Sequence, residues 1–224
     1  MIDVRNITKN YTIDGQMLKA VDGVSFSVKK GEIVSIIGHS GSGKTTLLSL
    51  IGGLTRPDSG DVLIGDTNIW SMGDDSLSEF RNRKISFIYQ FASLIPTLTS
   101  LENIMLPTAF GRYGADTEKY AVELLGLVGL KDKINSYPSH LSGGQQRRIA
   151  IARAFINRPE IVLADEPTGD LDEDSEEEVI RLFTRMNAER QMTFIIVTHN
   201  RDIAAKTQRQ LTMSNGVVSE IGAG

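Results

Sequence analysis

Short apolar runs alternate with longer amphipathic segments along most of the chain. Val24, Phe26 and Val28 alternate with polar neighbours, which predicts a half-buried strand. Residues 33–37 instead form a nearly continuous apolar run of the kind that is buried inside a parallel sheet. Longer helical patterns separate this run from similar runs at residues 85–89, 161–164 and 194–197. The alternation predicts an α/β fold with a mostly parallel sheet.

The pattern changes between about residues 91 and 156, where no convincing strand appears. The segments that read as helices in this region are residues 101–109, 117–128 and 145–156. We therefore predict one domain over residues 1–224, with a helical subdomain at about 91–156. The catalytic core and a β subdomain are expected at about 1–90 and 157–224.

Two local signals stand near the C-terminal half. Asn215-Gly216 lies between two short apolar runs, which is the strongest short signal for a hairpin. The acidic run at residues 172–178 is expected to open a helix, because negative charge complements the positive N-terminal end of a helix.

Composition and charge exclude several classes of protein. The 24 basic and 28 acidic residues give a net charge of −4, so no general attraction to nucleic acid is expected. The absence of cysteine excludes disulfides and thiolate metal sites, and three histidines disfavour a histidine-only metal site. No apolar stretch reaches the ~18 residues of a membrane span. We expect a soluble, cytoplasmic protein.

Residues 38–45 read Gly-His-Ser-Gly-Ser-Gly-Lys-Thr, a glycine, four residues and then Gly-Lys-Ser/Thr. Glycines at this spacing let backbone N–H groups wrap a phosphate, and the next helix, expected over residues 46–51, points its positive end at it. Lys44 is placed to reach the β and γ oxygens, and the Thr45 hydroxyl to bind Mg²⁺. The expected nucleotide contacts here are Gly38, His39, Ser40, Gly41, Ser42, Gly43, Lys44, Thr45 and Thr46.

Two carboxylates end the apolar run at residues 161–164. Asp165 and Glu166 follow it directly, and ligands of open parallel sheets bind at this end of the strands. We expect Asp165 to hold Mg²⁺ and Glu166 to accept a proton from the water that attacks the γ-phosphate.

The segment Leu141-Ser-Gly-Gly-Gln145 leads into the last helix of the inserted region. A serine and two glycines at a helix N-terminus offer a second anion site, separate from the phosphate loop. The basic residues expected to support this site from behind are Arg147, Arg148 and Arg153. Chance would produce this pentapeptide only roughly once in two thousand chains of this composition.

Together, and in this order over essentially the whole chain, these motifs resemble those of nucleotide-binding subunits of ATP-binding-cassette (ABC) systems. The resemblance implies a P-loop NTPase with a RecA-like parallel sheet core, an N-terminal antiparallel β subdomain and an inserted α-helical subdomain. It also implies ATP and Mg²⁺ as cofactors, an Mg²⁺-dependent ATPase activity, and an ATP-dependent, head-to-tail homodimer.

The same resemblance implies roles for single residues that are weak signals alone. Tyr11 would stack on adenine, Gln90 would contact Mg²⁺ and the attacking water, and His199 would contact the γ-phosphate. Without the resemblance, Tyr11 reads as a strand-packing aromatic, Gln90 as a surface amide and His199 as a structural histidine. The implied catalytic residues are Glu166, His199, Gln90 and Lys44, and the implied metal ligands are Thr45, Gln90 and Asp165.

The resemblance further implies that one subunit closes on the ATP of another. Ser142, Gly143, Gly144 and Gln145 would contact the ATP held by the second subunit, and Asp172 would lie in the loop that crosses the dimer interface. Three positions depart from the common pattern: His39 stands where proline is frequent, Asn200 where aspartate is common, and Asp170 where asparagine is common.

Within the family, residues 87–107 and 209–216 closely resemble the lipoprotein-releasing (LolD-like) and macrolide-efflux (MacB-like) ATPases. Gly38-His-Ser-Gly and residues 180–183 also resemble the cell-division ATPase FtsE. The resemblance implies a membrane permease partner of the MacB, LolC–LolE or FtsX type, with this chain peripheral on the inner face of the cell membrane. No nucleic-acid partner is expected.

The loop after Gln90 is more apolar than a solvated loop should be. We expect about half of its apolar residues to pack internally and the rest to line a groove for a short helix of the membrane partner. These residues are Phe91, Leu94, Ile95, Leu98 and Leu101.

Two other classes share part of this evidence. P-loop kinases and GTPases need the phosphate loop and the carboxylates, but not Leu-Ser-Gly-Gly-Gln. ABC proteins of DNA repair or translation keep every motif, but usually add a second cassette, a coiled coil or a zinc hook, which this chain lacks. Transport-type coupling is therefore the favoured function.

Overall fold

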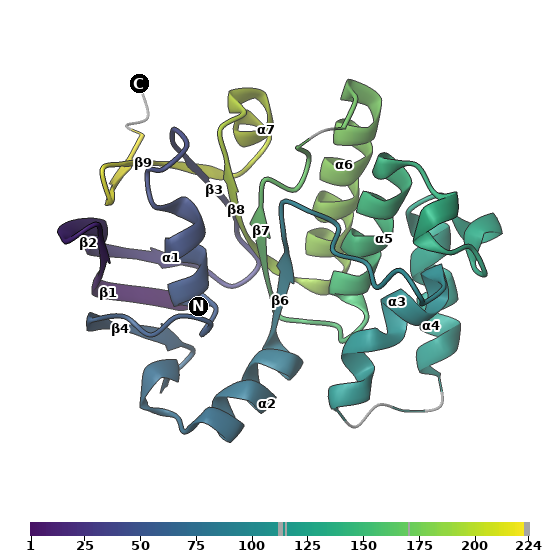
Figure 1. Ribbon diagram of the computed structural model, residues 1–224, viewed down its shortest axis with the longest axis horizontal. Helices are drawn as coiled ribbons and strands as arrows, with labels where there is room; N and C mark the ends of the chain where they lie inside the picture. The colour runs from purple at the N-terminus through teal and green to yellow at the C-terminus, as the bar shows by residue number, and fades with distance from the viewer. Residues whose placement is uncertain (112–113, 115, 170, 222–224) are drawn as a thin grey trace.

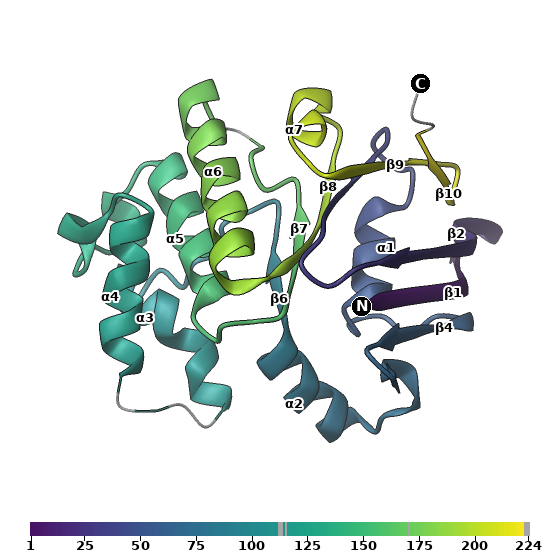
Figure 2. The ribbon, with the colours of Figure 1, turned by 180° about the vertical axis from the view of Figure 1, so that it is seen from behind.

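The computed structural model describes residues 1–111, 114, 116–169 and 171–221 and contains two sheets (Figures 1 and 2). The smaller sheet has the order β2-β1-β4-β5 and is antiparallel. Its strands are β1 (Ile2–Ile13), β2 (Gln16–Val28), β4 (Ser59–Ile64) and β5 (Thr67–Asn68). The predicted alternation at Val24, Phe26 and Val28 lies within β2, where the two valines are buried.

The larger sheet has the order β10-β9-β3-β8-β7-β6, and only its β9–β10 pair is antiparallel. Its strands are β3 (Ile33–Ile37), β6 (Ile85–Ile88), β7 (Ile161–Asp165), β8 (Thr193–Thr198), β9 (Arg209–Ser214) and β10 (Val217–Glu220). The mostly parallel sheet is thus confirmed. The predicted hairpin is confirmed as well, because Asn215 and Gly216 join β9 to β10 with φ of 49° and 78°.

Alternate side chains of the parallel strands enter two different cores. Leu163 and Ile195 face α1 (Lys44–Ile51) and the antiparallel sheet, whereas Val162 and Phe194 face the helices on the other side. These helices are α3 (Ser100–Met105), α4 (Thr117–Leu127), α5 (Gly143–Phe155) and α6 (Glu173–Arg190). Figures 1 and 2 both place α1 on one side of the sheet and α5 and α6 on the other.

Two helices differ from the sequence-based prediction. The helix expected over residues 101–109 ends at Met105 and continues as a 3₁₀ turn over Leu106–Phe110, because Pro107 has no N–H for an α-helical hydrogen bond. α2 (Asp74–Lys84) was not predicted, since Leu77 is its only buried residue and no apolar stripe marks it. The short α7 (Arg201–Ala205) follows β8.

Between residues 91 and 156, the described part of the chain has no strand, in agreement with the sequence-based prediction. The helices of this region share their core with α6 and with one face of the parallel sheet. The boundaries of the subdomain, at about residues 90 and 157, stay a prediction.

Candidate active site

The phosphate loop connects β3 to α1. The Lys44 ammonium lies across it and donates to the carbonyl oxygens of Gly38 at 2.7 Å and His39 at 3.0 Å. Gly43 has a φ of 103°, and a Cβ there would collide with the carbonyl oxygen of Ala20 on β2, so only glycine fits. The strand run of residues 33–37 and this glycine requirement thus fix the course of the loop.

The phosphate loop is joined directly to the end of β7. Thr45 Oγ1 donates a hydrogen bond of 2.7 Å to Asp165 Oδ2, although 120 positions separate the two residues. Thr45 is the second residue of α1, and Asp165 is the last residue of β7. The hydroxyl and the carboxylate predicted to hold a metal therefore lie side by side.

The surroundings of Asp165 disfavour its charge in the absence of a cation. Burial raises the pKa of this carboxyl above its ordinary value of 3.8, and the charge of Glu166 acts in the same direction. The hydrogen bond from Thr45 and the charges of Lys44 and Arg147 lower the pKa in part. A cation at this position would relieve the desolvation cost.

Glu166 has both carboxylate oxygens engaged by the end of β8. Thr198 Oγ1 donates to Oε2 at 2.9 Å, while the backbone N–H of His199 donates to Oε1 at 3.0 Å. His199 Nδ1 lies 2.9 Å from Oε1, and its imidazole is 72% exposed. Thr198 was not among the predicted site residues, and the parallel β7–β8 register places it beside the carboxylate.

Several other residues predicted to contact nucleotide are exposed. Tyr11 is exposed on β1, opposite Leu18 of β2, and the Lys9 ammonium lies 5.8 Å from its ring centroid. Gln90 is exposed just after β6. His39, Ser40 and Gly41 are exposed, and the His39 carbonyl also accepts the Ser42 N–H at 3.2 Å.

Ser142 caps α5 and does not reach the phosphate loop of its own chain. Its hydroxyl accepts the Gln145 N–H at 3.2 Å, while the Gln145 side chain accepts the Ser142 N–H at 3.0 Å. Gly143 and Gly144 form the first turn of α5, on the opposite side of the parallel sheet from α1 (Figures 1 and 2). Within one chain, the parallel sheet therefore separates Ser142–Gln145 from the phosphate loop.

Asp172 caps α6, which the acidic run opens as predicted. Its carboxylate accepts the Ser175 N–H at 2.8 Å, and this hydrogen bond lowers the pKa of Asp172 below 3.8. Asn200 caps α7 in the same way, accepting N–H groups of Asp202 and Ile203. Asp170 lies outside the described residues.

The expectation that three arginines support an anion site at the start of α5 is wrong. Arg148 donates to the Val128 carbonyl and to Glu178, and Arg153 donates to the carbonyls of Ala92 and Ser93. Arg147 is buried and donates to main-chain carbonyls of two loops, the one after β6 and the one after β7. Sequence reasoning missed this role, because a carbonyl carries no signal in the side-chain pattern.

The residues present fit a nucleotide with Mg²⁺. Ser42 Oγ is buried in the loop and has no hydrogen-bond partner among the described residues, so it is available to a phosphate oxygen. Thr45 and Asp165 offer the hard oxygen ligands that Mg²⁺ prefers. In the part of the chain that is described, no group of three or more His, Asp or Glu side chains is arranged so that it could hold a metal ion by itself. Beyond these two residues and the predicted ligand Gln90, Mg²⁺ would take its ligands from phosphate and water.

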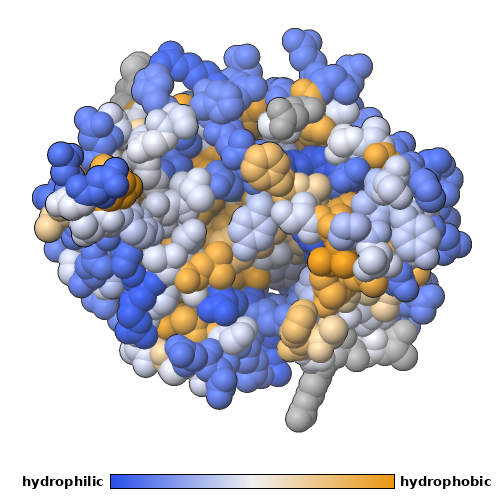
Figure 3. All heavy atoms as spheres, viewed as in Figure 1, coloured by the Kyte–Doolittle hydropathy of each residue, from blue (hydrophilic) through white to orange (hydrophobic). Residues whose placement is uncertain are grey.

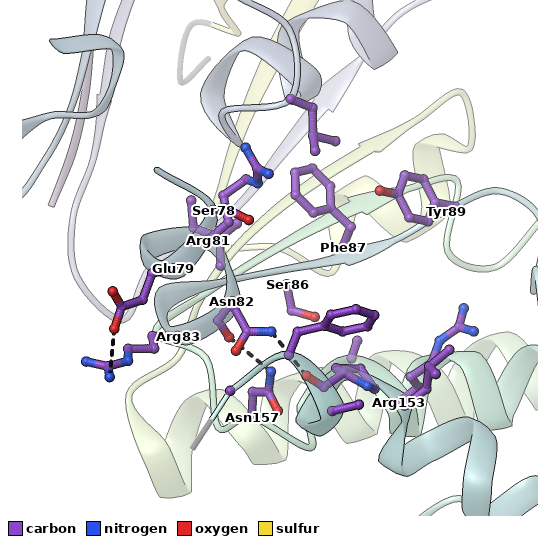
Figure 4. A pocket seen from close by; sticks show the side chains of 18 of the residues that line it. Ser78, Glu79, Arg81, Asn82, Arg83, Ser86, Phe87, Tyr89, Arg153 and Asn157 are labelled. Carbon is purple, nitrogen blue, oxygen red and sulfur yellow. Dashed lines mark hydrogen bonds and ion pairs between the residues drawn. The ribbon is translucent and has the colours of Figure 1, made fainter. Parts of the chain in front are cut away.

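A second concave surface lies between α2 and the 3₁₀ turn over Leu106–Phe110, and we call it the α2 groove. It encloses about 1090 Å³, and in the space-filling view hydrophobic and hydrophilic residues both border the hollow (Figure 3). Phe87 and Tyr89 stack on each other in its wall, with ring centroids 5.7 Å apart (Figure 4). The five apolar residues expected to line a groove after Gln90 do not line this one, and Leu94 and Leu101 instead pack against the core.

Among the described residues, no helix has the length and apolar character needed to cross a membrane.

Comparisons with known proteins agree with this geometry. The sequence pattern of the family described as ABC transporter matches residues 21–169. The chain is 46% identical over 215 residues to the lipoprotein-releasing system ATP-binding protein LolD of Cytophaga hutchinsonii, covering 95% of this chain and 96% of that protein. Identity to the macrolide export ATP-binding/permease protein MacB of Rhodopirellula baltica is 40% over 223 residues, covering 98% of this chain but 33% of that longer protein.

Solved structures resemble the whole chain. A dimeric ATP-binding cassette in a post-hydrolysis state, bound to ADP and Pi, has a TM-score of 0.92 at 38% identity, and each chain covers 100% of the other. CbiO1 from Clostridium perfringens, part of the transporter complex CbiONQ, has a TM-score of 0.85 at 27% identity and covers 97% of this chain and 86% of its own. The predicted P-loop NTPase fold, with its antiparallel β and helical additions, is confirmed.

Proposed function

Because the chain belongs to the ABC transporter family, as a subunit that binds and hydrolyses ATP, we propose that it powers a membrane partner of the lipoprotein-release or macrolide-export type. The observation that carries the ATPase part of this proposal is the hydrogen bond between Thr45 and Asp165. It brings the phosphate loop and the catalytic carboxylates to one place. The near-complete coverage of LolD proteins supports the choice of partner type.

Hydrolysis is assigned to the residues around this hydrogen bond. Lys44 and the phosphate loop bind the β- and γ-phosphates, and Tyr11 stacks on the adenine. Glu166 accepts the proton of the attacking water, while His199 and Gln90 contact the γ-phosphate and that water. Thr45, Asp165 and Gln90 would hold Mg²⁺, which would neutralise charge on the phosphates.

The dependence on Mg²⁺ gives a direct test of this assignment. Phosphate release by the purified chain is measured with ATP in the presence of Mg²⁺ and after chelation with EDTA. We expect turnover to be lost on chelation and restored by added Mg²⁺. Equal rates in both conditions would remove Thr45 and Asp165 from the proposed metal site.

We further propose a head-to-tail homodimer that encloses two ATP molecules. Ser142–Gln145 lie on the far side of the sheet from the phosphate loop of their own chain, so a second copy must supply them to complete a site. The exposed N–H groups at the start of α5 would then bind the γ-phosphate held by the other subunit. The dimeric state of the similar cassettes supports this arrangement.

Light scattering tests the dimer. The Glu166→Gln variant with ATP is expected to be dimeric, because turnover is blocked and one negative charge near the γ-phosphate is removed. Without nucleotide the same variant should be monomeric. A monomer at saturating ATP and tens of micromolar protein would contradict the sandwich.

The α2 groove is proposed as the docking site of a permease of the MacB, LolC–LolE or FtsX type. Its exposed side chains include Phe110, 77% exposed, and Tyr89, 47% exposed. Its wall combines apolar residues such as Pro107 with charged residues such as Glu79 and Arg81, so it suits a short amphipathic helix. The groove also contacts the loop after β6 through Tyr89, so movement of Gln90 would reach the docked helix. The chain would thereby lie on the cytoplasmic face of the membrane.

A further inference from the structure

The buried guanidinium of Arg147 connects two loops of the active site. The side chain belongs to α5 and is 4% exposed. Its Nε donates to the Pro167 carbonyl oxygen at 2.9 Å. Its terminal nitrogens donate to the carbonyl oxygens of Glu166, Tyr89 and Gln90. One side chain therefore holds the loop after β7 and the loop after β6 together.

The backbone of Glu166 is strained where Arg147 binds it. Its φ is 45°, in the left-handed region that costs energy for a residue with a Cβ. The Glu166 N–H donates to Val197 at 2.9 Å, and its carbonyl oxygen accepts from the Gly169 N–H at 3.1 Å and from Arg147. The guanidinium thus helps to fix the backbone from which the carboxylate projects.

Arginine is suited to this position because its planar fork can donate to several carbonyls at once. Neither amide nor ammonium can span four acceptors on two loops.

We propose that Arg147 is a positioning residue for ATP hydrolysis, which ties the helix beginning at Ser142 to the backbones of Glu166 and Gln90. This inference rests on the proposed function. In the proposed head-to-tail dimer, Ser142 contacts the ATP bound by the second subunit, whereas Glu166 acts on the ATP bound by its own chain. Arg147 therefore links the two ATP sites of the dimer.

The test compares wild type, Arg147→Gln and Arg147→Lys in phosphate release over a range of ATP concentrations. We expect kcat of Arg147→Gln to fall about 100-fold, the order of loss that a small misplacement of a catalytic group causes. We expect KM for ATP to change less than about threefold, because the phosphate loop is untouched. Arg147→Lys should lose at least about tenfold in kcat, since one ammonium cannot hold both loops. Any positive cooperativity of the wild type in ATP should be reduced in both variants.

Arg148→Gln is the matched control, because it removes a neighbouring guanidinium that binds Val128 and Glu178 away from the site. It should keep wild-type kcat and KM. Thermal melts report whether each variant is folded, and Arg147→Lys decides the question if Arg147→Gln does not fold.

Three results would overturn the inference. A folded Arg147 variant with kcat within about threefold of wild type would show that the two loops hold their positions without the guanidinium. Failure of both variants to fold would assign Arg147 to stability alone. If wild type itself releases no phosphate, the proposed function fails, and this outcome is distinct from the first two.

Discussion

His199 and Glu166 form a closely paired unit, in which the His199 backbone N–H lies 3.0 Å and its ring Nδ1 2.9 Å from the same carboxylate oxygen. The imidazole is exposed, whereas the carboxylate is 13% exposed. The carboxylate is thus largely shielded from solvent, whereas the ring hydrogen-bonded to it is open to solvent.

Replacing Glu166 by Gln should abolish turnover and keep ATP binding. The amide has the shape of the carboxylate but cannot accept the proton, and loss of a general base costs ~10²- to 10⁴-fold in rate. Phosphate release and nucleotide binding by fluorescence titration measure the two effects. Glu177→Gln, on the exposed face of α6, is the matched control and should retain the wild-type rate. Release within threefold of wild type would exclude Glu166 as the base.

Replacing His199 by Ala should reduce kcat by ~10- to 100-fold with little change in Tm. The ring positions the Glu166 carboxylate, but it is 72% exposed, and exposed side chains contribute little to folding. Steady-state kinetics and thermal melts check both statements. His140→Ala, also exposed but before the start of α5, serves as the comparison for Tm alone. A large drop in Tm for His199→Ala would indicate a structural histidine.

Replacing Asp172 by Ala should lower Tm at neutral pH more than at acidic pH. The Ser175 N–H lowers the pKa of Asp172, so this carboxylate contributes stability above its unfolded pKa of about 4. That contribution is lost as pH falls through the lower, folded pKa. Melts of wild type and variant between pH 7 and pH 3 measure the difference. Asp174→Ala should show a smaller change of its Tm difference with pH. A Tm difference between wild type and Asp172→Ala that stays the same from pH 7 to pH 3 would contradict the role given to the Asp172 carboxylate.

Replacing Phe110 by Glu should weaken stimulation by the membrane partner and leave basal hydrolysis intact. Phe110 is exposed in the α2 groove, so a charge there would weaken contact with the apolar face of the docked helix without disturbing the core. ATPase activity with and without the reconstituted partner measures the effect. Leu98→Glu is the informative comparison, because Leu98 is half-buried outside this groove and its carbonyl accepts from Asn103. Stimulation of Phe110→Glu equal to wild type, in a folded protein, would place docking elsewhere.

Much of the fold was predictable, because local patterns carry it. The run at residues 33–37 and the glycines of the phosphate loop predict β3 and the turn into α1, and both are present. α2 was missed because its apolar positions are few. Its charges did hold a signal: Asp74 and Asp75 stand in the first turn and Arg81, Arg83 and Lys84 in the last, as the helix dipole favours.

The sequence by itself determined the chemical groups and their order: the phosphate loop, the Ser-Gly-Gly turn at the start of α5, and the two carboxylates at the end of β7. Spacing along the chain encodes these groups, since each is a local backbone arrangement. Only the tertiary structure decided which of them meet. Thr45 reaches Asp165, Glu166 reaches His199, and Arg147 binds the carbonyls of two loops. Such contacts depend on strand register and helix packing between distant segments, and main-chain carbonyls, which every residue has, leave no trace in the sequence.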